Sequence, residues 1–332
     1  MTDALFLTSE AVDDLATPAD YVAAVRDGYR EVGEGAPAEP RTLLPSGDPP
    51  GMLTTYVAML PEVGAMGGYT YAAGFAERDA WFLTPLFDAE TGEPLAVIDG
   101  ASMNPFKTGA AGAVAVDALA RPDASTVAVI GSGPQARGQL RTTATVRDLT
   151  GVRVFSPTPA NRESFADEFA ERLDADVTAV SSADAALADA DVVITATTAS
   201  EPVIADADVE PGAHVTAMGQ YAADKHELPP ALIARATYVP DLTARATRDA
   251  GSFIAAREAG LVSDDDLEVE LGDVVAGSHP GRTSDDEVTV FDSGGTGIET
   301  VAAAHMLYER AREAGRGTPL SIAPASEALT GR

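Results

Sequence analysis

Cysteine is absent from this chain of 332 residues, and lysine is almost absent. Without cysteine, neither disulfides nor thiolate metal sites can form. Lys107 and Lys225 are the only lysines, so the rest of the 22 basic residues are arginine. Acidic residues number 52, which gives a net charge of -30. This charge argues against nucleic acid as a partner, because phosphate backbones bind basic surfaces.

Long apolar runs are missing as well. No stretch approaches the length that crosses a membrane, and Met1 to Leu7 carry no basic segment of the kind that begins a signal peptide. We therefore expect no membrane as a partner. Hydrophobic residues still make up 45% of the chain, which is enough for a folded core. A surface crowded with carboxylates and nearly free of lysine suits concentrated salt, so we expect the cytoplasm of an extreme halophile.

The segment from Thr126 to Gln139 has the pattern of a dinucleotide-binding turn. Thr126–Ile130 is a short β-branched run that predicts a buried parallel strand. Gly131 allows a positive φ, Gly133 allows the backbone to approach a pyrophosphate, and Ala136 lets a helix lie against the strand. Pro134 fits the first turn of that helix, whose N-terminus would hold the phosphate. The alternative is a glycine-rich turn in another kind of α/β sheet.

Further strand-like runs after this turn predict an α/β fold with a Rossmann-type, doubly wound parallel sheet. Segments of helical composition separate most of these runs. The expected strands, besides the first, are Val152–Phe155, Val177–Val180, Val192–Thr197, His214–Met218 and Tyr238–Val239.

The first hundred residues predict a different, α+β unit. Pro18–Gly33 has apolar residues along one helical face. Strands are expected at Met52–Leu60, Gly68–Ala72, Trp81–Phe87 and Pro94–Ile98, the last two as a hairpin. A helix from Asn104 as N-cap to about Ala120 would lead into the dinucleotide unit, with Pro105 first and Lys107 third in that helix.

The end of the second strand of the dinucleotide unit indicates which cofactor is bound. An NAD site usually places an acidic residue there, to bond the ribose 2′-hydroxyl. In the segment Val154–Arg162 there is no carboxylate, and the first one after it is Glu163. Ser156, Thr158 and Arg162 are instead suited to a 2′-phosphate. We therefore expect NADP in preference to NAD. The alternative is an ordinary turn with two prolines.

Several short segments match one known family in order and spacing. They are Pro40-Arg41, Ile98-Asp99-Gly100, Lys107-Thr108-Gly109-Ala110, Gly131–Gln139, Asp191–Thr198, Lys225-His226-Glu227-Leu228, Glu270–Asp273 with Pro280-Gly281-Arg282, and Phe291–Gly294. On these motifs the chain resembles the ornithine cyclodeaminase/μ-crystallin family. The resemblance implies a homodimer of two-domain subunits: a substrate-binding and dimerisation domain from residues 1–112 with 300–332, and a dinucleotide-binding domain from residues 113–299.

The resemblance also implies a set of cofactor-binding residues. These are Thr108, Gly131, Ser132, Gly133, Gln135, Ala136, Ser156, Thr158, Arg162, Thr195, Thr197, Lys225 and Ser293. Ser293 follows an expected strand and precedes the last helix, about Ile298 to Ala314, so it would return toward the nicotinamide. The alternative is a structural crossover between domains. The four histidines have no metal-ligand spacing, so we expect no metal.

The catalytic positions depart from the family pattern. Arg41 stands where the family binds a substrate carboxylate, the alternative being a solvated surface arginine. Lys107 replaces the arginine of the family's Arg-Thr-Ala-Ala and keeps its positive charge without the bidentate fork. Tyr69 occupies the catalytic lysine position and Tyr221 the catalytic aspartate position. Each tyrosine is a reasonable proton donor, or else a wall of the pocket.

These features predict an NAD(P)-dependent oxidoreductase acting on a small amino, imino or keto acid. Arg41 and Lys107 would bind substrate, and Tyr69, Lys107 and Tyr221 would be catalytic. We expect Tyr69 to donate the proton, with the Lys107 charge favouring an anion beside it, either a substrate carboxylate or a partly ionised phenol. The alternatives are an ornithine cyclodeaminase with a recycled NAD, and a nucleotide-binding homologue that has lost catalysis.

Overall fold

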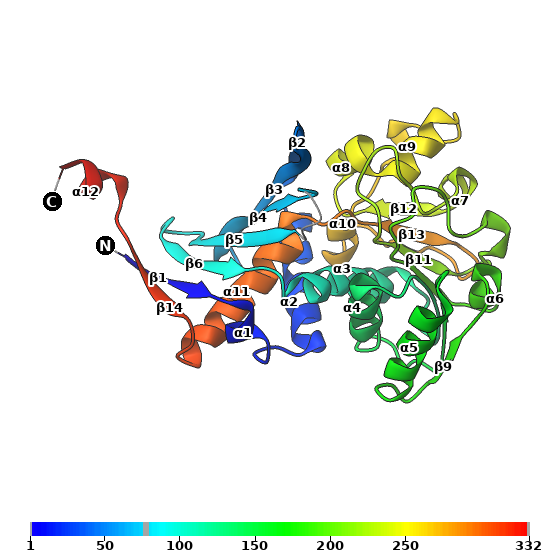
Figure 1. The fold of residues 1–332 in the computed structure, drawn as a ribbon. Helices are drawn as coiled ribbons and strands as arrows, with labels where there is room; N and C mark the ends of the chain where they lie inside the picture. Colours follow the sequence, from blue (N-terminus) through cyan, green and yellow to red (C-terminus); the bar gives the residue numbers. More distant parts are fainter. Residues whose placement is uncertain (1, 76–79, 331–332) are drawn as a thin grey trace. The chain divides into compact units, whose positions relative to one another are not determined.

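The computed structural model describes residues 2–75 and 80–330, which form two compact units (Figure 1). The first unit contains Met1–Lys107 and Thr296–Arg332, and the second contains Thr108–Gly295. The domain limits expected from the sequence, after residues 112 and 299, lie a few residues further along the chain. Among the described residues, no helix is long and apolar enough to cross a membrane.

The first unit is built on a seven-stranded sheet in the order β14-β1-β6-β5-β4-β3-β2. The pairs are antiparallel except β1 with β6. Its strands are β1 (Thr2–Leu7), β2 (Ala38–Gly47), β3 (Pro50–Leu60), β4 (Ala65–Ala73), β5 (Trp81–Asp88), β6 (Pro94–Asp99) and β14 (Thr318–Ile322). The sequence predicted β3 to β6 at these places, but the edge strand β2, which contains two prolines, β1 and β14 were not predicted.

Two helices pack on each other and supply the hydrophobic core of this unit. They are α2 (Pro18–Gly33) and α11 (Gly297–Glu313), as predicted. A Cβ placed on Gly28 of α2 would lie 3.1 Å from the Ala302 Cβ of α11, so glycine permits this close approach. The short helices α1 (Ser9–Val12) and α12 (Ala325–Thr330) complete the unit.

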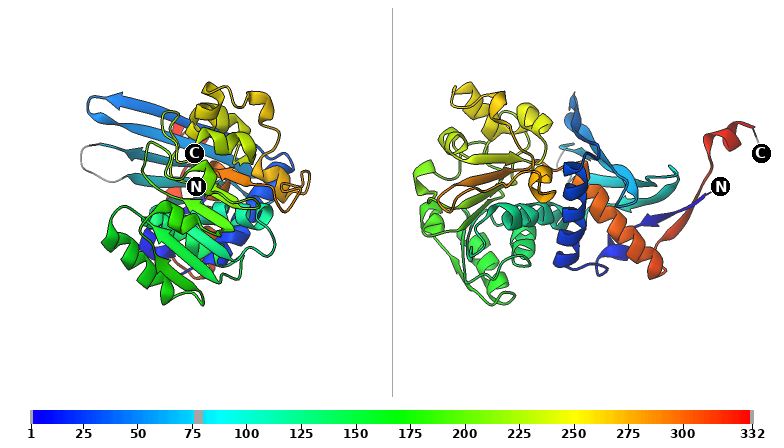
Figure 2. Two further views of the ribbon diagram at one scale, coloured as in Figure 1. Left: turned by 90° about the vertical axis from the view of Figure 1, so that its right-hand side faces the viewer. Right: turned by 180° about the vertical axis from the view of Figure 1, so that it is seen from behind.

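The sheet of the first unit has an inner and an outer face. Along β3, Thr54, Tyr56 and Ala58 are buried beneath α11, while Val57 and Met59 point outward and are exposed. This alternation is the two-residue period of a strand with one covered face. The long hairpin of β2 and β3 is drawn in blue in Figure 2.

The second unit has a seven-stranded parallel sheet in the order β12-β13-β11-β10-β7-β8-β9. Its strands are β7 (Thr126–Ile130), β8 (Gly151–Phe155), β9 (Asp176–Ala179), β10 (Val192–Thr195), β11 (His214–Ala217), β12 (Thr237–Pro240) and β13 (Thr289–Asp292). The order reverses between β7 and β10, which is the arrangement of a doubly wound dinucleotide-binding sheet. The predicted fold class is therefore confirmed.

Helices cover both faces of this sheet, as its continuous apolar strands require. One core lies under α3 (Asn104–Leu119), α4 (Pro134–Thr143) and α5 (Pro159–Ala170). The other lies under α6 (Ala183–Leu187), α7 (Pro230–Arg235), α8 (Thr243–Asp249) and α9 (Gly251–Glu258). The remaining helices are α10 (Leu271–Val275), η1 (Asp206–Asp208) and η2 (Asp264–Asp266).

The start of α3 differs from the prediction by one residue. Asn104 is the first helical residue rather than the N-cap, and the Lys107 N–H donates to the Met103 carbonyl at 2.9 Å. Pro105 is therefore second and Lys107 fourth in the helix. Proline is still tolerated there, because the first N–H groups of a helix have no intrahelical acceptor.

Candidate functional site

The turn after β7 has the shape expected of a phosphate-binding loop. Gly131 has φ +120, and a Cβ there would lie 2.4 Å from the Ala196 carbonyl oxygen, so only glycine fits. Gly133 is the N-cap of α4, and a Cβ built on it would meet nothing within 4 Å. The open space in front of Gly133 lets a ligand approach the helix N-terminus, and Pro134 is the first helical residue as predicted.

The first turn of α4 supports this interpretation. Ala136 is fully buried against the β7 core, where a larger side chain would push the helix away. The Gln135 Oε1 is buried and has no hydrogen-bond partner among the described residues. An unsatisfied acceptor beside an uncapped helix N-terminus suits a ligand that carries phosphates and hydroxyl donors. The residues of this turn therefore fit a dinucleotide.

The end of β8 lies beside this turn. The Ser132 and Ser156 hydroxyls are 2.9 Å apart. Arg162 of α5 donates to the Ser156 carbonyl at 2.8 Å, and its guanidinium lies 5.7 Å from the centre of the Phe155 ring. Thr158 is exposed at the N-cap of α5. The structure thus holds Arg162 next to Ser156, at the strand end that reads the adenosine ribose in this fold.

Two predicted cofactor residues, Thr195 and Thr197, bond to Glu227, a motif residue to which the sequence assigned no role. The buried Thr195 hydroxyl donates to the Glu227 carboxylate at 3.0 Å, and the Thr197 and Gly219 N–H groups donate to it at 2.7 and 2.8 Å. The Thr195 side chain is therefore held by Glu227, and its role at the cofactor stays a prediction. Burial raises the pKa of Glu227, and these hydrogen bonds oppose the rise.

The Ser293 side chain is held by hydrogen bonds within the second unit. It is 1% exposed, and its hydroxyl donates to Asp241 Oδ2 at 2.8 Å and accepts from the Gly295 N–H at 3.2 Å. Asp241 in turn accepts a hydrogen bond from Arg245 at 2.5 Å. These hydrogen bonds fix the turn after β13, and the role of Ser293 at the cofactor stays a prediction.

The other predicted residues of the second unit are accessible. Lys225 is exposed and Tyr221 is 38% exposed. Thr108 is half-buried, and its carbonyl accepts from the Gln139 amide at 2.9 Å. Their predicted roles at the cofactor and substrate are compatible with this exposure.

In the first unit, two predicted substrate residues meet on one tyrosine. Arg41 lies at an irregularity of β2 and is 6% exposed, so it is not a solvated surface arginine. Its guanidinium is 5.3 Å from the centre of the Tyr56 ring, and the Lys107 Nζ is 5.7 Å from the same centre. Both cations are therefore buried near one aromatic ring, and an anionic substrate group would be attracted to them.

Lys107 has a partner that the sequence analysis missed. Its Nζ donates to Glu299 Oε1 at 3.4 Å, and both side chains are 1% exposed. Burial lowers the pKa of Lys107, Glu299 opposes this, and Arg41 adds to it. The only signal in the sequence was indirect: Glu299 follows Thr296 at capping-box spacing.

Tyr69 is buried in a group of aromatic rings. Its ring stacks on Phe82 with centres 5.0 Å apart, and its hydroxyl donates to the Gly100 carbonyl at 3.1 Å. Burial raises the pKa of Tyr69 far above its usual range. Of the two anions expected beside Lys107, the partly ionised phenol is therefore disfavoured, because burial opposes the charged form of Tyr69.

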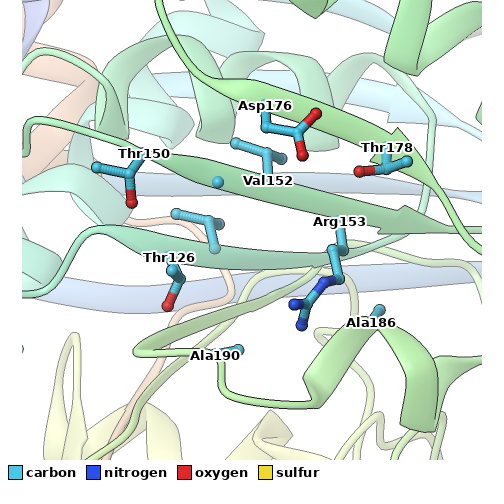
Figure 3. A pocket seen from close by; sticks show the side chains of 10 residues that line it. Thr126, Thr150, Val152, Arg153, Asp176, Thr178, Ala186 and Ala190 are labelled. Atoms are coloured by element: carbon cyan, nitrogen blue, oxygen red, sulfur yellow. The ribbon is translucent and has the colours of Figure 1, made fainter.

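One cavity of the second unit lies away from the dinucleotide turn. It has a volume of about 210 Å³ and is lined by Thr126, Thr150, Asp176 and other residues at the amino ends of β7, β8 and β9 (Figure 3). The phosphate turn follows the carboxyl end of β7, and ligands of such sheets bind at that edge. This cavity is therefore not the cofactor site. Within the part of the chain that is described, no group of three or more His, Asp or Glu side chains has metal-binding geometry.

Comparison with known proteins identifies the family. The sequence pattern of the ornithine cyclodeaminase/mu-crystallin family matches residues 2–315. The chain belongs to this family. The resemblance predicted from the motifs is thus confirmed over nearly the whole chain.

Relatives within the family bind nicotinamide cofactors. The chain is 37% identical over 237 residues to an iminosuccinate reductase of Paracoccus denitrificans, covering 71% of this chain and 72% of that protein. The structure of the present chain superposes with a TM-score of 0.89 on the Δ1-pyrroline-2-carboxylate reductase of Thermococcus litoralis in complex with NADH and L-proline. The two are 29% identical, and the match covers 95% of this chain and 100% of that one. An archaeal alanine dehydrogenase dimer with bound NAD gives a TM-score of 0.90 at 29% identity, covering 97% and 100%.

Proposed function

We propose that this protein is a reductase or dehydrogenase that interconverts a small imino or keto acid and the corresponding amino acid. The enzyme is an NAD(P)-dependent oxidoreductase of its family. The observation that carries the proposal is the pair of buried cations, Arg41 and Lys107, on the Tyr56 ring. A small substrate with a carboxylate is the ligand that such a pair would bind, and the turn at Gly131 and Gly133 would hold the dinucleotide.

In this reaction, a few side chains bind the substrate and enclose it. The guanidinium of Arg41 binds the substrate carboxylate, in a setting from which water is largely excluded. The aromatic side chains Tyr56, Tyr69 and Phe82 form the walls. The bound dinucleotide supplies or accepts the hydride. Tyr221 keeps its predicted catalytic role as part of the proposal.

The test is a spectrophotometric screen at molar KCl with NADH and NADPH. Substrates are Δ1-pyrroline-2-carboxylate, pyruvate with ammonia, and iminosuccinate, because relatives carry these activities in their names. Net oxidation of the reduced cofactor by one of them is the expected result. Ammonia release from ornithine without net cofactor change would identify a cyclodeaminase instead. Binding of cofactor with no turnover of any substrate would indicate a non-catalytic homologue.

An arginine variant locates the substrate site. Arg41→Met removes the charge and keeps an apolar stem of similar length. KM is expected to rise by about 10–100-fold with kcat changed less, since a charge-assisted bond of about 1.5–3 kcal/mol to the carboxylate is lost. The matched control is Arg26→Met on α2 of the same unit. Equal KM values for the Arg41 variant and the parent would contradict the proposal.

We propose NADP(H) as the preferred cofactor. The support is Arg162, which is held beside Ser156 at the end of β8, with no carboxylate among residues 156–162. The solved relatives named above carry NADH or NAD. The proposed preference for NADP(H) therefore rests on this chain's own residues and not on those relatives.

A homodimer formed through the outer face of the first sheet is also part of the proposal. The face is defined here as the outward side chains of β3 and β5, and it includes Leu53, Val57, Met59, Trp81, Leu83 and Phe87, each at least 37% exposed. The chain has a net charge of -30, yet this exposed face is apolar. An exposed apolar face on such an acidic protein indicates an interface. Leu83→Glu is expected to give a monomer in sedimentation at molar KCl, whereas the same change at the exposed Leu261 of the second unit should not.

The acidic composition supports a cytoplasm with molar salt as the working environment. At such concentrations the Debye length is about 3 Å, so repulsion among surface carboxylates is largely screened.

A further inference from the structure

The buried ion pair of Lys107 and Glu299 joins two elements that are far apart in the sequence. The Lys107 Nζ on α3 donates to Glu299 Oε1 on α11 across a separation of 192 residues. Both side chains are 1% exposed. Long charged side chains are rarely buried to this extent without a function or a strong structural reason.

Glu299 is held in place independently of Lys107. Its Oε1 accepts the Thr296 N–H at 2.7 Å, and its Oε2 accepts the Thr296 hydroxyl at 2.5 Å. It is the third residue of α11, a helix of 17 residues, where the free N–H groups favour negative charge. The carboxylate is therefore a fixed acceptor that sets the position of the Lys107 ammonium.

The groups around the ammonium come from four elements. Arg41 of β2 repels it, Glu299 of α11 attracts it, and the ring faces of Tyr56 on β3 and Tyr69 on β4 lie 5.7 and 4.9 Å away. Burial lowers the pKa of Lys107 and so makes its ammonium a stronger acid than an exposed lysine. Burial has the opposite effect on the acidity of Tyr69, whose O–H is already bonded to Gly100.

We propose that the Lys107–Glu299 pair is the proton source of the reaction, with Lys107 as the catalytic acid and Glu299 as the positioning residue that keeps its ammonium charged and fixed. This rests on the proposed function, in which a reduced nicotinamide dinucleotide is the reductant. Tyr69 then holds the ammonium with its ring face and is not the donor that the sequence suggested.

The proton and electron balance is simple. The imine carbon gains a hydride and forms a C–H bond, while the π pair of the C=N bond moves to nitrogen. That nitrogen takes a proton as the Nζ–H bond breaks, and the product is an amine. Lys107 is left as a neutral amine and regains its proton from water before the next turnover.

The presence of only two lysines makes a direct test possible. Protein labelled with ¹³Cε-lysine should give two NMR signals, and Lys225→Arg assigns them. The Lys107 signal is expected to titrate at lower pH than an ordinary lysine, because burial lowers its pKa. In Glu299→Gln it should titrate lower still, because the neighbouring negative charge is gone. Glu299→Asp should restore part of the difference.

Glu31→Gln is the matched control. Glu31 is a buried glutamate of the same unit that accepts the Glu62 and Val63 N–H groups at 2.7 and 3.0 Å. This variant should leave the Lys107 titration unchanged. A Glu299→Gln protein in which Lys107 titrates as in the parent would overturn the proposal, whether or not the enzyme turns over. If the Glu299→Gln protein does not fold, the Glu299→Asp titration decides in the same way.

Kinetics test the catalytic part separately. The pH above which kcat falls should move down with the Lys107 titration in Glu299→Gln, and Lys107→Arg should lower kcat by about 10²–10⁴-fold, since guanidinium keeps its proton. A shifted titration with an unshifted rate profile would refute the proton-source role. Absence of turnover in the parent would refute the proposed function while leaving the titration result interpretable.

Discussion

Removal of the guanidinium of Arg245 is expected to destabilise the second unit strongly. Arg245 is 1% exposed and binds three carboxylates, with Nε to Asp241 at 2.5 Å, one terminal nitrogen to Asp249 at 2.9 Å and the other to Asp292 at 2.6 Å. Arg245→Met keeps much of the side-chain volume and removes the charge. Asp241 and Asp292 are then buried without a cation.

The expected cost follows from this geometry. Breaking a buried ion pair by removing one partner costs about 3–5 kcal/mol, because the other charge stays buried. Asp241 keeps the Ser293 hydroxyl and the Gly294 N–H as donors, at 2.8 and 3.1 Å. Its share of the cost is therefore expected in the lower half of that range, and the whole range is kept for the variant because Asp292 is affected as well. At about 2–4 °C per kcal/mol for a unit of this size, the melting temperature should fall by about 6–20 °C.

The pH dependence gives a second, independent signature. Burial raises the pKa of Asp292, and Arg245 opposes the rise. Without Arg245 the native variant keeps a proton on Asp292 at pH values where the unfolded chain, with a pKa of about 3.9, has lost it. The native state then binds more protons than the unfolded state, so stability falls as the pH rises through that window. The deficit of the variant should be larger at pH 8 than at pH 5.

The assay is thermal unfolding by circular dichroism in 3 M KCl at both pH values. Arg245→Lys is the matched variant, because an ammonium keeps the charge but cannot bind three carboxylates with the geometry of a guanidinium. We expect it to lose an intermediate amount of stability. Adding Asp292→Asn to Arg245→Met should recover part of the loss. A deficit under about 1 kcal/mol at pH 8, or an equal deficit at both pH values, would refute the reasoning.

Three further outcomes are expected. The melting temperature of the parent should rise between 0.1 and 3 M KCl, as the Debye length falls from about 10 Å to below about 3 Å; an unchanged value would show that repulsion among carboxylates is not limiting. In cofactor titrations, Arg162→Ala should weaken NADPH binding more than NADH binding, and equal losses would remove Arg162 from the 2′-phosphate site. Asp20→Asn should cost about 1 kcal/mol, because the carboxylate caps α2 through Thr17 and pairs with Arg310 at 2.7 Å. The pKa of Asp20 is lowered by these partners, so this stability is present above the unfolded pKa of about 3.9 and the difference should close only as the pH falls below it.

Local patterns in the sequence were sufficient for the dinucleotide half of the fold. The turn from β7 into α4 depends on residues adjacent in the chain: Gly131 for its positive φ, Gly133 for open backbone and Pro134 for the first helical turn. The limits of α2 and the strand positions of the second unit followed in the same way, from capping signals and β-branched runs. Such features are set by interactions within a few residues, which a sequence displays directly.

The electrostatics of the site were decided by the tertiary structure. Glu299 lies 192 residues from Lys107, Asp241 lies 52 residues from Ser293, and Glu227 lies 32 residues from Thr195. No spacing rule in the sequence connects these pairs, because the contacts form only when separate elements pack together. Burial has the same origin: it raises the pKa of Tyr69 and lowers the pKa of Lys107, which residue types alone do not show. The sequence therefore determined which chemical groups are present, while packing determined which of them are paired, which are shielded from water and which can give up a proton.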